Sequence, residues 1–192
     1  MKFKLKDLKI NRTEWISFLL TLIATLAGVL IAIWLTNSGI RSKEKEDTIK
    51  LLQTANIILV NTNEYANTLN SSFIEFERDT VNYKIDALEE FKSNNPIPYP
   101  DLLEAVISNE LISKNISEFS HSRIYTGLIN FKKLANYESV KNYQKSLEVM
   151  ILLLNLEIEN QKGEINSQEF VSKFQNGRKR IYDILENEVI YK

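Results

Sequence analysis

The residue types that carry most enzyme chemistry are scarce in this chain of 192 residues. It contains no cysteine and a single histidine, His121, which lies in the polar sequence SEFSHSR near an expected helix start. We interpret His121 as a surface or capping residue, because one imidazole without a thiolate cannot assemble a zinc site of the usual kind. The sequence therefore predicts neither a zinc centre nor a histidine-dependent reaction.

Carboxylates are the remaining candidates for chemistry. Glu75, Glu77 and Asp79 lie close together, and Glu157 and Glu159 are near neighbours. Residues two apart on a helix point away from each other, so neither group makes a convincing metal site or acid–base pair. The phosphate-loop, dinucleotide and nucleophile-elbow patterns are missing from the sequence. We therefore expect a protein that is not an enzyme and has no cofactor, metal or small-molecule substrate.

One basic cluster is a candidate contact site for an anion. Arg178, Lys179 and Arg180 could touch an anionic lipid headgroup or an acidic partner, although a solvated helix face is the simpler interpretation. A nucleic-acid partner is disfavoured, because the chain after residue 36 carries 19 lysines and arginines against 23 acidic residues.

The element that positions the chain is an uncharged run from Trp15 to Ile40. Its apolar part, residues 15–35, would form a helix about 31 Å long, which matches a hydrocarbon core of about 30 Å. Trp15 and Trp34 lie near its two ends, where tryptophan prefers the headgroup region. A cleaved signal peptide is the alternative, but its apolar core is shorter and small residues flank its cleavage site. We expect a single-pass anchor in the cell membrane.

The flanking cations give a weak preference for one orientation. Five lysines and arginines precede the run, and four lie in residues 36–50. Because cytoplasmic loops are enriched in these residues, we expect a cytoplasmic N-terminus and an extracytoplasmic C-terminal domain.

Small residues recur along one face of the predicted span. Ala24, Gly28 and Ala32 are four residues apart, and Thr21 and Thr25 lie beside them. Small residues let two helices approach closely, and the threonines could bond to a partner helix or to carbonyl groups of their own helix. The pattern is compatible with a self-association face, although a simple monomeric anchor is slightly favoured.

The composition and periodicity predict an all-α protein in four parts. These are a basic flank at 1–14, a transmembrane helix at 15–36, a charged juxtamembrane segment at 37–50 and a helical bundle at 51–192. Strand alternation is nearly absent, and we expect four to six soluble helices. Three prolines in the segment 93–101 predict a loop, and a Pro-rich ligand motif is the less favoured alternative.

The first soluble helix should cover residues 42–92, continue from the span or follow a joint at 37–39, and have a possible interruption at 70–72. Its apolar positions alternate at spacings of three and four, which predicts either an intermolecular coiled coil or an intramolecular bundle helix. These positions are Leu52, Ala55, Leu59, Thr62, Ala66, Leu69, Phe73 and Phe76.

Two later helices are delimited by their caps. One should run from near Tyr137 to a C-cap at Gly163, with the apolar run VMILLLNLEI at its centre. That run of ten residues includes Asn155 and Glu157, so it is too short and too polar to cross a bilayer. The last helix should start at Asn166, where Glu169 can complete a capping box.

The segment LIATLAGVLIAIWLTNSGIRSKEKEDTIKLL resembles a broad group of uncharacterised bacterial single-pass membrane proteins. In that group an N-terminal span of GVLIA type runs into a charged helical domain. The resemblance implies a membrane anchor, but it carries no assigned site residues.

These features together predict a membrane-anchored, non-enzymatic helical module for protein–protein interaction or self-association. It would act as a subunit of a membrane complex or as a sensor-like domain. The alternative is an oligomerising membrane effector, toxin-like or linked to bacterial immunity, that perturbs the bilayer. The expected partners are the lipid bilayer and a second copy of the chain or another membrane protein.

Overall fold

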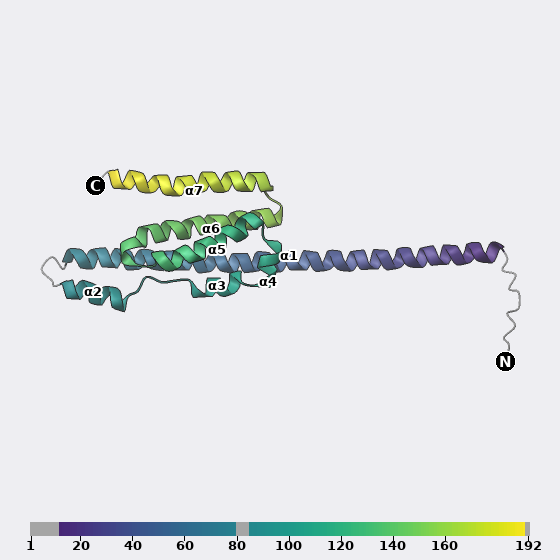
Figure 1. Ribbon diagram of the computed structural model, residues 1–192, viewed down its shortest axis with the longest axis horizontal. Helices are drawn as coiled ribbons and strands as arrows, with labels where there is room; N and C mark the ends of the chain where they lie inside the picture. Colours follow the sequence, from purple (N-terminus) through teal and green to yellow (C-terminus); the bar gives the residue numbers. More distant parts are fainter. Residues whose placement is uncertain (1–11, 80–84, 191–192) are drawn as a thin grey trace, which may run out of the picture. The chain divides into compact units, whose positions relative to one another are not determined.

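The computed structural model describes residues 12–79 and 85–190, and within these ranges the protein is helical without strands (Figure 1). The described residues form seven α-helices and one short 3-10 helix. They are α1 (Arg12–Asp79), α2 (Ile85–Asn94), α3 (Asp101–Ile107), α4 (Glu110–Asn115), α5 (Glu118–Leu134), η1 (Tyr137–Ser139), α6 (Val140–Lys162) and α7 (Ser167–Ile190). The predicted all-α class is confirmed. Most of the predicted basic flank lies outside the described residues.

Helix α1 is continuous over its 68 residues. It passes through 37–39 and 70–72 without a break. The prediction that the first soluble helix continues from the span is therefore confirmed, and the alternative joint and the possible interruption are wrong. The segment contains no proline, and its only glycines, Gly28 and Gly39, lower helix propensity without ending a helix. Of the predicted helix at 42–92, the structure describes one part in α1, up to Asp79, and another part in α2, from Ile85.

The chain separates into two compact units, residues 1–44 and residues 45–192. In the second unit, the C-terminal half of α1 buries one apolar stripe against other helices of the same chain. Five predicted stripe positions are at most 7% exposed: Leu52, Ala55, Leu59, Ala66 and Leu69. Burial within the chain favours the intramolecular interpretation of this stripe over the intermolecular coiled coil.

Helix α6 is the central element of the core. It packs against both α5 and α7, and Figure 1 shows α6 and α7 on one side of residues 45–79, with α2 on the other. Helical spacing in the sequence also predicts six positions for the buried face of this helix, and all six are buried: Val140, Tyr143, Leu147, Met150, Leu154 and Ile158. The apolar run at 149–158 is therefore an interior helix segment.

The Pro-rich loop is held by the tyrosines of the following helices. The Tyr143 hydroxyl donates to the carbonyl oxygen of Pro98 at 2.5 Å, and the Tyr137 hydroxyl donates to that of Asn95 at 2.6 Å. Burial raises the pKa of Tyr143 above its ordinary value, since the phenolate would lose its hydration. These bonds fix the connector between α2 and α3.

The caps predicted from the sequence are present. Gly163 ends α6 with a φ of +80°, a left-handed conformation that glycine adopts without a Cβ clash. The Asn166 side chain accepts from the amides of Gln168 and Glu169, and Glu169 accepts from the amide of Asn166, each at 3.0 Å. Ser117 caps α5 by accepting from the amide of Ser120.

Candidate functional site

The predicted span lies in α1, which is long and apolar enough to cross a membrane by length and composition. Its side chains are not buried against the rest of the chain. Trp15 is 52% exposed and Trp34 is 67% exposed, and all of the large apolar residues between them are comparably accessible. This segment therefore presents a continuous apolar surface around the whole helix.

The small-residue face on this segment is open. An added Cβ at Gly28 would meet no atom within 4 Å, and Ala24 and Ala32 are also exposed. The Thr25 hydroxyl donates to the carbonyl of Thr21 at 2.8 Å, and the Thr21 hydroxyl donates one turn back in the same way. The sequence predicted that the threonines bond either to a partner helix or to carbonyl groups of their own helix. In the structure they bond to their own helix. The face retains room for a second helix.

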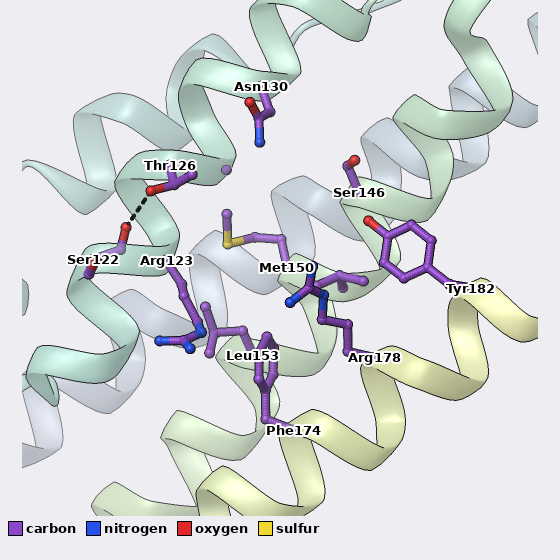
Figure 2. Close-up of a pocket in the computed structure, with 12 residues that line it drawn as sticks. Ser122, Arg123, Thr126, Asn130, Ser146, Met150, Leu153, Phe174, Arg178 and Tyr182 are labelled. Atoms are coloured by element: carbon purple, nitrogen blue, oxygen red, sulfur yellow. Dashed lines mark hydrogen bonds between the residues drawn. The ribbon is translucent and has the colours of Figure 1, made fainter.

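A pocket of about 340 Å³ lies between α5, α6 and α7 (Figure 2). The polar side chains that line it come from α5 and α6 and include Ser122, Asn130 and Ser146. The apolar part is formed by residues such as Met150 and Phe174. The size is within the range of ordinary small-ligand pockets.

The three residues of the predicted basic cluster, Arg178, Lys179 and Arg180, lie differently with respect to this pocket. Arg178 lines the pocket, and with Lys179 it also lines an adjoining hollow of about 380 Å³. Arg180 lines neither of the two. All three side chains are exposed, as expected for a solvated helix face. One turn of α7 thus directs Arg178 and Lys179 toward the hollowed surface and Arg180 away from it.

Sequence reasoning missed the cation that faces Arg178. Arg123 of α5 lines both hollows, and its guanidinium carbon lies 3.4 Å from the ring centroid of Phe119 and 5.5 Å from that of Phe174. Its Nη1 donates to the carbonyl of Phe119 at 3.3 Å. Burial, and then repulsion from Arg178, lower the pKa of Arg123, but a guanidinium keeps its charge at neutral pH.

A second feature that the sequence analysis missed is a buried carboxylate. Glu157 of α6 is fully buried and accepts from the Ser120 hydroxyl at 2.6 Å and from the Ser117 hydroxyl at 2.8 Å. It also accepts from the Ser117 amide at 3.1 Å and from Gln161 Nε2 at 2.9 Å. Glu159, two residues on, pairs instead with Lys173 at the surface. The Glu157 cluster joins α6 to the start of α5.

This carboxylate has a structural explanation. Its four donors satisfy both oxygens, and a buried carboxylate needs such bonds to offset the loss of hydration. Within residues 12–79 and 85–190, no three side chains of His, Asp or Glu gather closely enough to hold a metal ion. We therefore treat Glu157 as the residue that fixes the N-terminus of α5 against α6.

Comparison with known proteins gives no match: none of the family models, curated proteins or solved structures is similar to this chain. The resemblance to bacterial single-pass proteins consequently depends on the residues of the N-terminal segment alone. The function has to be argued from the chain's own surfaces.

Proposed function

We propose that this protein is a membrane-anchored helical module that acts by binding protein partners or a second copy of itself. Residues 15–36 would be the single-pass anchor, and the second unit would be a helical bundle outside the bilayer. The observation that carries the proposal is the exposure of every large apolar side chain between Trp15 and Leu35. Such a surface is unfavourable in water and is typical of a segment that lies in lipid.

The proposed role is non-enzymatic interaction, as a subunit of a membrane complex or as a sensor-like domain. The support comes from the sequence, which has one histidine, no cysteine and no nucleotide-binding or nucleophile motif. The orientation that we propose, with a cytoplasmic N-terminus, follows from the slight excess of cations before the span.

Crosslinking in native membranes tests the interaction role. We expect crosslinked dimers or heteromeric adducts, and we expect Gly28→Ile to reduce the self-adducts because the added side chain would separate two close helices. Ala27→Ile is the matched control, since residue 27 lies about 100° around the helix from residue 28. A strictly monomeric protein without partners, unaffected by Gly28→Ile, would contradict the proposal.

The second candidate is an oligomerising membrane effector, toxin-like or linked to bacterial immunity, that perturbs the bilayer. The open face at Ala24, Gly28 and Ala32 favours it. Overexpression should then depolarise cells, and Gly28→Ile should restore the membrane potential. Normal potential and growth after forced clustering of the protein would exclude this candidate.

A further inference from the structure

The pocket between α5, α6 and α7 carries positive charge without a neutralising group. Arg123 and Arg178 approach it from two different helices, on either side of Phe174 (Figure 2). Neither this pocket nor the adjoining hollow is lined by an aspartate or glutamate. Within the described part of the chain, neither arginine has a carboxylate at ion-pair distance. Two cations that share a hollow without a counter-charge form an attractive site for an anion.

The two guanidinium groups are held in place by aromatic contacts. Arg123 stacks on Phe119, and Arg178 lies 5.8 Å from the ring centroid of Tyr182. A guanidinium presents its N–H groups in a planar fork that matches two oxygens of a phosphate or carboxylate. With Lys179 at the adjoining hollow, three cations are available, which suits a dianion better than a monoanion.

The remainder of the pocket suits an uncharged body attached to that anion. Asn130 and Ser146 have polar side chains facing the space, and Met150, Leu153 and Phe174 give it an apolar side (Figure 2). A pocket that is apolar with a few polar groups and one charged end is the usual form of a site for a small amphipathic molecule.

We propose that this pocket binds a phosphate monoester with a compact apolar or aromatic body, with the phosphate between Arg123 and Arg178. The ligand would be either a soluble metabolite or a lipid with a phosphate monoester headgroup. This site differs from the sequence-based expectation of no small molecule. It does not depend on membrane anchoring or on self-association.

Calorimetry on the full chain in a neutral detergent tests the proposal, with phenyl phosphate as the probe. We expect saturable binding that inorganic phosphate competes for and phenol alone does not reproduce. Arg178→Gln should weaken binding about tenfold, the usual effect of losing a charged hydrogen bond. Arg180→Gln is the matched control, because it removes the same charge from the same helix but lines neither hollow, and binding should be unchanged.

Because Arg123 packs on Phe119, removing its whole side chain could destabilise the fold, and Arg123→Lys is the better variant at that position. Its unfolding temperature should be compared with that of the wild type. The variant keeps the positive charge but loses the planar set of guanidinium N–H donors. We therefore expect weaker binding of phenyl phosphate and an unchanged unfolding temperature. Absence of saturable binding to the wild type, or equal affinities for Arg178→Gln and Arg180→Gln, would overturn the proposal.

Nanodiscs distinguish the two sources of ligand. In discs of phosphatidylcholine with added phosphatidic acid, a lipid ligand would compete and reduce the affinity for phenyl phosphate. An affinity equal to that in pure phosphatidylcholine would assign the site to a soluble phosphate monoester.

Discussion

Two apolar helical segments of this chain have opposite surroundings. Residues 15–35 of α1 are exposed around the whole helix, whereas residues 149–158 of α6 are enclosed by α5 and α7 and contribute the fully buried Leu154. Both runs are rich in leucine and isoleucine. The two runs differ in length and in polar content, since the α6 run is short and contains Asn155 and Glu157.

The comparison shows that apolar helical segments of one chain can be either buried among other helices or exposed. The α6 segment obtains its apolar environment from neighbouring helices, and its one carboxylate obtains donors from Ser117 and Ser120. Among the described residues of its unit, the α1 segment has no such neighbours. Its polar side chains are Ser17 and two threonines that bond to their own helix. Its environment has to come from outside the chain, which is the physical basis for the proposed anchor.

The largest effect should follow from placing charge in the exposed segment. The double substitution Ile23→Arg with Leu30→Arg should cost about 6 kcal/mol of insertion free energy, because each arginine near the centre of a span is unfavourable. Carbonate extraction should then release the variant from membranes. Leu102→Arg, at a side chain 70% exposed on α3, is the control and should remain membrane-bound. Equal extraction of wild type and double variant would contradict the proposed anchor.

Truncating a leucine should distinguish the two segments by stability. Leu154→Ala should lower the free energy of unfolding of the second unit by about 2–5 kcal/mol, since it leaves a cavity in the core. Leu26→Ala should leave that unfolding transition unchanged, because Leu26 is 55% exposed in the other unit. Chemical denaturation followed by circular dichroism in detergent measures both. Similar losses of unfolding free energy for Leu154→Ala and Leu26→Ala would contradict the proposed difference between the two segments.

Replacing the buried carboxylate should have a smaller effect. Glu157→Gln keeps the shape but directs an amide N–H₂ toward groups that are themselves donors, and it should cost about 1–3 kcal/mol of unfolding free energy. The control Glu159→Gln breaks only a surface pair with Lys173 and should cost less than about 1 kcal/mol. Denaturation midpoints give the difference, and a control as damaging as Glu157→Gln would refute the structural role of the cluster.

The smallest effect concerns pH. The Lys132 ammonium at 2.6 Å and the Tyr99 hydroxyl at 2.5 Å lower the pKa of Glu104 in the folded protein. Its contribution to stability is therefore complete above the unfolded-state pKa and is lost as the pH falls through the folded-state pKa. From neutral pH to about pH 3, the unfolding temperature of the wild type should fall slightly more than that of Glu104→Gln. Identical pH profiles would contradict the prediction.

Local signals predicted much of the fold. The spacing of three and four residues identified the buried stripe of α1 and the inner face of α6, because helical periodicity alone determines which side chains share a face. Gly163 and the pair Asn166 and Glu169 marked helix ends, since caps act over only a few residues. The sequence between Asp79 and Ile85 contains no proline or glycine, which explains why one long helix was expected over 42–92.

The pocket and the carboxylate cluster were not predictable in the same way. Glu157 lies on the inner face of α6, and this position is the one signal that could have suggested burial. Its serine donors come from about 40 residues earlier in the chain. Arg123 likewise meets Arg178 only through the packing of α5 and α7 around α6. Periodicity places a residue on a face, but it does not identify the residue on the opposite helix.

Single-cysteine labelling tests the central claim most directly, because the natural chain has no cysteine. A membrane-impermeant maleimide should leave Leu26→Cys unmodified in sealed or opened membranes and should modify it once detergent and denaturant are added. Leu102→Cys should react in opened membranes, and its reaction in intact cells would report the side on which the second unit lies. Labelling of Leu26→Cys as rapid as that of Leu102→Cys in opened membranes would contradict the assignment of residues 15–36 to the bilayer.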